Sequence, residues 1–204
     1  MNVTDELIPT RRSLLVRLKD WNDHESWRVF FDTYWKLIYG WALRSGLSNA
    51  EAQDVVQETI ISVLKSMPSF KYDEVHGSFK SWLLRLTTWK ITDQVRRRQL
   101  LIEDQVLPAA SGGAEALGAS VDPAIEQTWN EEWERNLVEA ALERVKRKVD
   151  PKQYQAYDLC VFQKWPVSKV ARSLDMNIGN VYLIKHRVGG QLKREIAHLR
   201  AKPI

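Results

Sequence analysis

The stretch at residues 101–128, "LIEDQVLPAASGGAEALGASVDPAIEQT", constrains the fold more than any other part of the sequence. It holds five acidic residues and no Lys or Arg, and it gathers glycine, serine and proline. Such a composition buries too little apolar surface to offset the entropy lost on ordering. Most of the stretch lacks helical or strand periodicity, so it predicts a flexible acidic linker between two domains.

The blocks on either side of this stretch have the composition of globular domains. The chain has 204 residues, of which 44% are hydrophobic and 27% charged. It contains no apolar run long enough to cross a bilayer, and its start lacks the order of a secretory signal. The lone Cys160 is expected to be a buried thiol in a reducing compartment. We therefore expect a cytoplasmic protein without membrane association.

The first block reads as a series of helices. Apolar residues recur at steps of three and four and predict a core-facing helix that Gly46 ends. Ser48 followed by Glu51 forms a capping box and predicts the start of a second helix. A third helix follows "YDEVHGSF", and after a predicted break near residues 88–90 a fourth covers residues 91–99. The expected core residues of the first helix are Trp27, Phe30, Phe31, Tyr34, Trp35, Ile38 and Ala42.

The second of these helices, Glu51–Leu64, has two distinct faces on a helical wheel. Glu51, Asp54 and Glu58 form an acidic ridge with Gln57 beside it, opposite the apolar residues. Two carboxylates four residues apart can bind Mg²⁺, but that chemistry needs a second acidic pair on a facing helix, and none is found. The four histidines lack zinc-binding spacing. We expect no metal and no cofactor, which leaves a solvated face or a partner surface. The inward residues are Ala52, Val56, Ile60 and Val63.

The second block predicts a helix-turn-helix. A short helix opening at Pro166 is followed by the turn "LDMN", in which Asp175 tolerates a left-handed backbone and Asn177 can cap the next helix. Residues 151–204 hold ten Lys or Arg against three Asp or Glu, a net charge of +7. The charge favours DNA binding, and the alternative is a three-helix bundle with solvated cations. The expected core residues are Val167, Val170, Ala171, Leu174, Val181, Ile184, Val188 and Leu192.

With these elements in place, the chain resembles the extracytoplasmic-function (group IV) sigma factors of bacterial RNA polymerase. The resemblance rests on "DVVQE" at residues 54–58, "SWLLRL" at 81–86, "TDQVRRR" at 92–98, the acidic linker and the helix-turn-helix. It implies an all-α fold with two small helical domains: sigma region 2 at residues 10–99, a linker at 100–128, and region 4 at 129–200. It also implies a protein that is not an enzyme but joins core polymerase, recognises promoter DNA and nucleates strand opening.

The resemblance implies roles for individual residues. Polymerase docking, on the clamp helices of the largest subunit, falls to Asp54, Gln57 and Glu58. Minus-ten recognition, with base capture on an aromatic surface, falls to Phe70, Trp89, Lys90, Arg96, Arg97 and Arg98. Minus-thirty-five recognition falls to Lys169, Arg172, Asn180, Lys185, His186 and Arg187. Further partners that the family suggests are the flap of the beta subunit and an anti-sigma factor.

Some residues depart from the family pattern. Pro166 replaces a Ser or Thr cap, Asp175 replaces a turn glycine, and Lys185 stands where Leu is usual. Gly189 and Gly190 lower helix propensity by about 1 kcal/mol each, so the recognition helix is expected to end or bend there. Two rival functions remain open: a free-standing helix-turn-helix regulator, which would act as a dimer, and a Mg-dependent helical-bundle nucleotide hydrolase that would use Asp54 and Glu58.

Overall fold

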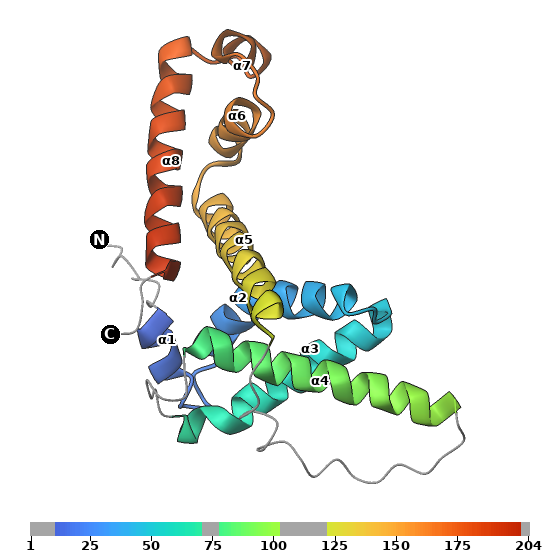
Figure 1. Ribbon diagram of the computed structural model, residues 1–204. Coiled ribbons are helices and arrows are strands. Elements are labelled where there is room, and N and C mark those ends of the chain that lie inside the picture. Colours follow the sequence, from blue (N-terminus) through green and yellow to red (C-terminus); the bar gives the residue numbers. More distant parts are fainter. Residues whose placement is uncertain (1–10, 71–77, 103–121, 201–204) are drawn as a thin grey trace. The chain divides into compact units, whose positions relative to one another are not determined.

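The computed structural model describes residues 11–70, 78–102 and 122–200, and within these ranges every regular element is a helix (Figure 1). The expected all-α fold is confirmed. The elements are α1 (Arg11–Arg17), α2 (His24–Arg44), α3 (Asn49–Ser66), the short 3₁₀ helix η1 (Met67–Ser69), α4 (Phe79–Ile102), α5 (Pro123–Lys148), α6 (Pro151–Val161), α7 (Val167–Ser173) and α8 (Ile178–Arg200).

Among the described residues the chain divides into two compact units, one made of residues 13–136 and the other of residues 137–200 together with residues 11 and 12. Of the predicted linker, residues 103–121 lie outside the described residues. Residues 123–128, which the sequence analysis placed in the linker, instead form the first turns of α5. Pro123 at the first helical position suits a helix start, since its missing N–H would have no partner there.

Helix α2 is bounded by local signals and buries one face. The Asp23 side chain accepts a hydrogen bond from the Ser26 backbone at 3.0 Å and caps the first turn. Gly46, with φ of +83°, takes the left-handed conformation that follows the last turn, as predicted. The prediction of the core face included Phe31, and this is wrong. Phe31 is 43% exposed, and its ring stacks against Trp35 with centroids 6.2 Å apart. The buried apolar residues are Phe30, Tyr34, Leu37, Ile38, Trp41 and Ala42.

Helix α3 starts at the predicted capping box. The Ser48 side chain accepts from the Glu51 backbone N–H at 3.3 Å, and the Glu51 carboxylate accepts from the Ser48 N–H at 2.8 Å. Its buried face includes Ala52, Val56 and Val63, as expected, while Ile60 is half-buried. α3 packs against both α2 and α4.

The predicted break near residues 88–90 is wrong, because α4 is one continuous helix from Phe79 to Ile102. Threonine hydroxyls bond back to carbonyls one turn earlier, from Thr87 to Leu83 at 2.8 Å and from Thr92 to Thr88 at 3.0 Å. The buried stripe also continues across the expected break, from Leu83 to Ile91. Tertiary burial therefore outweighs the low helix propensity of this threonine-rich stretch.

The first part of α5 belongs to the core of the unit at residues 13–136. Trp129 and Trp133 are almost completely buried, and the Trp133 ring lies 5.1 Å from the Tyr34 ring. The Trp129 indole N–H donates to the Lys80 carbonyl at 3.2 Å, and the Asn136 amide donates to the Thr33 carbonyl at 2.7 Å. These contacts anchor the start of α5 to α2 and α4.

The second unit packs α6, α7 and α8 around one cluster. Cys160 is buried and free as expected, and burial raises the pKa of its thiol. The recognition helix was expected to end or bend at Gly189 and Gly190, and it does not end there, since α8 continues to Arg200. A Cβ at Gly189 would lie 3.7 Å from the Tyr157 ring, an ordinary van der Waals distance, so α8 passes beside α6 here without a steric need for glycine. The cluster contains Val145, Ala156, Tyr157, Cys160, Val170, Ala171, Val181, Ile184 and Val188.

Candidate functional site

The acidic ridge on α3 divides into paired and exposed members. Glu51 serves the capping box, and the hydrogen bond from the Ser48 backbone is the main reason why its pKa is lowered. Arg98 lies 3.5 Å from the same carboxylate. Asp54 and Gln57 are exposed, and among the residues that the structure describes no ion pair engages Asp54. Only part of the ridge is therefore open to a partner.

Glu58 lies between two cations of α4. Its Oε1 is 2.6 Å from the Arg97 guanidinium, and its Oε2 is 3.3 Å from the Lys90 Nζ. Partial burial raises the pKa of Glu58, but the hydrogen bonds from Arg97 and Lys90 outweigh this effect, and the pKa is lowered overall. Glu58 is therefore ionised at neutral pH and links α3 to α4.

The three arginines predicted to hold phosphates are each paired within the chain. The buried carboxylate of Asp93 lies 2.8 Å from Arg96 and 2.6 Å from Arg97, and Arg98 approaches Glu51. Their side chains stay 47%, 39% and 45% exposed, respectively. A guanidinium has five N–H donors, so these pairs fix the arginines while leaving donors directed to solvent.

The two aromatic residues predicted for base capture have different surroundings. Phe70 belongs to an aromatic cluster, with ring centroids 5.1 Å from Trp82 and 6.1 Å from Phe79. Trp89 lies in the middle of α4, half-buried, and the Lys90 ammonium lies 4.4 Å from its ring centroid. Trp89 and Lys90 fall at the predicted break between two helices, and the continuous α4 places them within one helix instead, both partly buried.

The helix-turn-helix has the predicted local geometry. Asp175 takes a positive φ of 47°, and the Met176 N–H donates to the Ala171 carbonyl at 2.8 Å. The Asn177 side chain accepts from the Gly179 N–H at 2.7 Å and caps α8. Small Ala171 is buried where α7 meets α8. The turn therefore fixes α8 against α7 through residues that the sequence already indicated.

All six residues predicted for minus-thirty-five recognition are exposed. Two of them are held by neighbours: the Lys169 ammonium lies 3.6 Å from the Trp165 ring centroid, and Arg187 donates a hydrogen bond to the Gln153 side chain. A cation over an indole keeps its charge while losing mobility. The exposed residues are Lys169, Arg172, Asn180, Lys185, His186 and Arg187.

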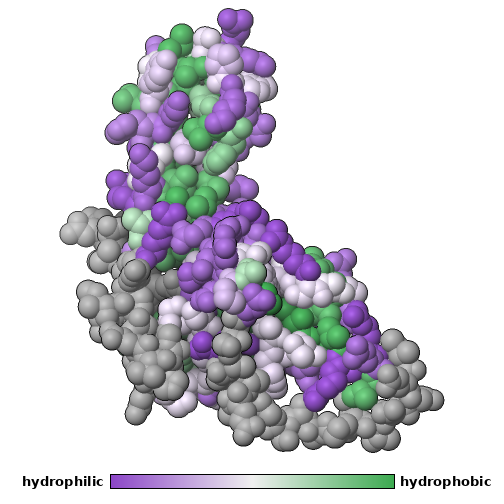
Figure 2. Space-filling model, in the orientation of Figure 1, coloured by the Kyte–Doolittle hydropathy of each residue, from purple (hydrophilic) through white to green (hydrophobic). Residues whose placement is uncertain are grey.

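Three exposed apolar side chains on α8 were missed by the sequence analysis. Ile178, Tyr182 and Leu183 are 51%, 58% and 70% exposed. They fall outside the buried stripe of Val181 and Ile184, so a helical wheel of this segment would have placed them on the exposed face. They were missed because only the charged and polar residues of that face were considered. Figure 2 shows hydrophobic residues interspersed with hydrophilic ones on the visible surface.

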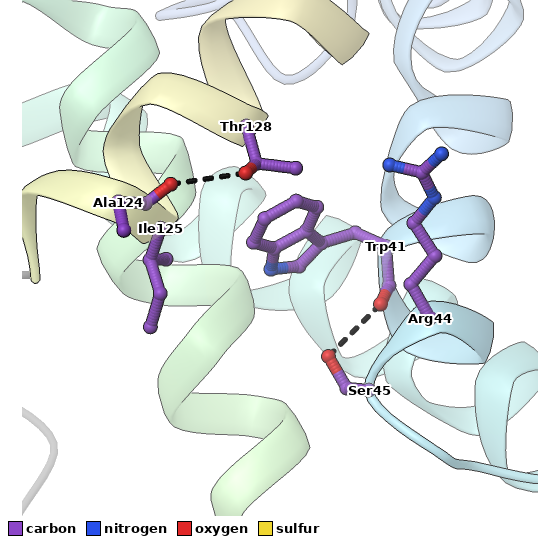
Figure 3. Close-up of a pocket in the computed structure, with 6 residues that line it drawn as sticks. All are labelled: Trp41, Arg44, Ser45, Ala124, Ile125 and Thr128. Atoms are coloured by element: carbon purple, nitrogen blue, oxygen red, sulfur yellow. Dashed lines mark hydrogen bonds between the residues drawn. The ribbon is translucent and has the colours of Figure 1, made fainter.

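A hollow of about 310 Å³ lies between the end of α2 and the start of α5 (Figure 3). Two hydroxyls near it bond within their own helices: Ser45 donates to the Trp41 carbonyl at 3.0 Å, and Thr128 donates to the Ala124 carbonyl at 2.9 Å. Arg44 is the one charged residue among its lining residues, and it pairs with Glu132 at 2.9 Å. The hollow therefore offers no free charged group that would select a ligand.

The described parts of the chain contain no cluster of three or more residues suited to hold a metal. None of their helices is long and apolar enough to cross a membrane. What the two units display is a partly paired acidic helix, a helix of paired cations beside a tryptophan, and a cationic helix-turn-helix.

Comparisons with known proteins agree with this arrangement. Residues 30–100 match the family model for sigma-70 region 2, which covers α2 from Phe30, α3 and most of α4. Over 172 residues the chain is 28% identical to the ECF RNA polymerase sigma factor SigE of Mycolicibacterium smegmatis. The aligned part covers 84% of this chain and 62% of that relative, so the chain spans less than two thirds of the relative's length.

Proposed function

We propose that the chain is an extracytoplasmic-function sigma factor, which joins core RNA polymerase, recognises promoter DNA and begins strand opening for transcription. The observation that carries the proposal is that one chain combines a match to sigma-70 region 2 with a separate helix-turn-helix whose second helix exposes cations. A protein that recognises two separate promoter elements needs two DNA-binding units, and the region 2 match and the helix-turn-helix can supply one each.

Docking on polymerase is assigned to the exposed part of the acidic ridge. Asp54 and Gln57 project from α3, whose opposite face is buried in the core. By the family resemblance the partner surface is formed by the clamp helices of the largest subunit, and the flap of the beta subunit receives region 4. A charged surface of this kind contributes orientation and association rate more than raw affinity.

The minus-ten surface is assigned to α4. Trp89 supplies a flat ring on which an unstacked base can stack, a contact worth roughly 1–3 kcal/mol per base. Arg96, Arg97 and Arg98 follow within two to three turns and keep exposed donors for phosphates. Phe70, which packs against Phe79 and Trp82, supports this surface from the neighbouring aromatic cluster.

The minus-thirty-five surface is assigned to the exposed face of α8. Asn180 and Arg187 carry the groups that pair with adenine and guanine edges in the major groove. Lys169 and Arg172 lie on α7, the helix that precedes the recognition helix α8, and in this motif that preceding helix usually contacts phosphates. The mechanism is binding and strand separation in the cytoplasm, without bond chemistry, so the protein is not an enzyme.

The test is in vitro transcription with purified core polymerase and fragments of genomic DNA. We expect promoter-specific starts only when the protein is added. Trp89→Ala is expected to slow open-complex formation more than it weakens polymerase binding, and Asp54→Ala to do the reverse. If promoter DNA is bound by a dimer without polymerase, and no start depends on the protein, a free-standing regulator is the correct description.

A further inference from the structure

Glu58 is fully engaged inside the protein. Each of its two carboxylate oxygens has a cationic partner on α4, Arg97 at 2.6 Å and Lys90 at 3.3 Å, and the carboxylate is only 31% exposed. Asp54, one turn earlier on the same helix, is exposed. The two acids therefore meet different surroundings, although both belong to the ridge that the sequence analysis assigned to polymerase docking.

Lys90 depends on this carboxylate. Its side chain is only 12% exposed, and an ammonium so deeply placed needs a nearby negative charge because it has lost much of its water. The same ammonium lies 4.4 Å from the centroid of the Trp89 ring. A lysine side chain has several rotatable bonds, and the pair with Glu58 removes that freedom. Glu58 thus holds the cation that lies over one face of the indole.

Arg97 extends the same set of contacts. It bridges Glu58 and the buried Asp93, and Asp93 in turn binds Arg96. Loss of Glu58 would leave Arg97 with Asp93 alone and Lys90 without its acid. The carboxylate therefore fixes two cations that lie seven residues, or about two helical turns, apart on α4.

We propose that Glu58 is a positioning residue, which through Lys90 holds the Trp89 ring in one orientation before DNA arrives, and that polymerase docking falls to Asp54 and Gln57. This inference rests on the proposed function, in which Trp89 receives a base. A ring already fixed in its binding orientation loses less entropy when the base stacks, so binding is stronger.

The test compares Glu58→Gln with Asp54→Asn in the full chain. Both changes turn an acid on α3 into its amide and raise the net charge by one, so their long-range effects on DNA are matched. The protein is labelled with 5-fluorotryptophan, and the Trp89 resonance is assigned with Trp89→Phe. Glu58→Gln is expected to shift or broaden this resonance, keep polymerase affinity within about twofold, and slow open-complex formation about tenfold, as for loss of a hydrogen bond to a charged group.

Asp54→Asn is expected to leave the Trp89 resonance unchanged and to weaken polymerase binding. Lys90→Gln, a second variant, should move the same resonance as Glu58→Gln, and Glu58→Asp should restore it in part. The inference is overturned if Glu58→Gln leaves the Trp89 resonance in place and weakens polymerase binding as much as Asp54→Asn does. A uniform change in the resonances of all nine tryptophans would also overturn it, because it would indicate general loosening.

The Trp89 resonance tests the positioning role of Glu58, and the transcription assay tests the proposed function, so either can be refuted without the other. If the Trp89 resonance responds as expected but wild-type protein forms no open complex, the proposed function is wrong while the role of Glu58 in orienting Trp89 stands. If wild type forms open complexes and the resonance is insensitive to Glu58, the proposed function stands and the positioning role is wrong.

Discussion

Trp133→Ala tests whether the start of α5 is part of the core at residues 13–136. The Trp133 side chain is 1% exposed, and its ring contacts Tyr34, which in turn lies 5.9 Å from Phe79 at the start of α4. Truncating a buried tryptophan costs about 3–5 kcal/mol, through lost burial and the cavity left behind. Because each 1.4 kcal/mol is a factor of ten, amide protection in α2 and α4 should fall by roughly 10²- to 10⁴-fold.

The measurement is hydrogen exchange followed residue by residue, because the two units can unfold separately and a single melting curve would mix them. Trp21→Ala is the matched control, since Trp21 is 52% exposed and the same atoms are removed. It should change protection by less than about tenfold, as expected for a surface site. Equal effects of the two substitutions, or a loss confined to α5, would refute the reasoning.

Three further outcomes are expected. Uracil lacks the methyl group of thymine, which the exposed Leu183 on α8 is expected to contact. Replacing thymine by uracil in the minus-thirty-five element should therefore weaken holoenzyme binding about fourfold per contacted methyl, and Leu183→Ala should abolish that difference in a gel-shift titration. The pKa of Asp23 is held at about 2, first by the hydrogen bond from Arg17, against 3.8 for an unperturbed carboxyl, so stability present above pH 4 should be lost as the pH falls toward 2. Asp23→Asn should reduce this loss in acid titrations followed by circular dichroism. Gly46→Ala should lower the free energy of unfolding by about 1 kcal/mol, because φ is positive at this position. Gly40→Ala should raise it by about 0.5–1 kcal/mol, because Gly40 lies within α2 and a Cβ there would have no other atom within 4 Å. Both changes are measured by urea unfolding.

The features that the sequence predicted are local ones. The capping box of Ser48 and Glu51, the left-handed Asp175 and the Asn177 cap depend on a few neighbouring residues, and all three occur in the structure. The spacing of apolar residues likewise predicted that Val181 and the other stripe residues of α8 lie on the buried face. Local hydrogen-bonding chemistry and periodicity are readable from a sequence because they need no knowledge of what packs against them.

The features that the sequence missed depend on distant residues. The break expected near residues 88–90 and the helix end expected at residues 189–190 do not occur: α4 and α8 continue through them, next to residues such as Ile91 and Val188 that are buried against other helices. The pairing of Glu58 with Arg97 joins positions 39 residues apart, so a wheel of α3 shows the acid but not its partner. Trp129 belongs to the core through α2 and α4, which the linker composition before it did not indicate.

In helix α8, one set of residues packs against the rest of the unit and a different set faces solvent. The side chains that hold it in place, Val181, Ile184 and Val188, are buried, while those between them point to solvent. Mutations on the outer face therefore leave the packing of the unit intact. Under the proposed function, such a helix can acquire a new set of target sequences after gene duplication by a few substitutions, without first gaining stability elsewhere. The same division then makes the outer face of α8 a practical place to engineer variants with altered target preference.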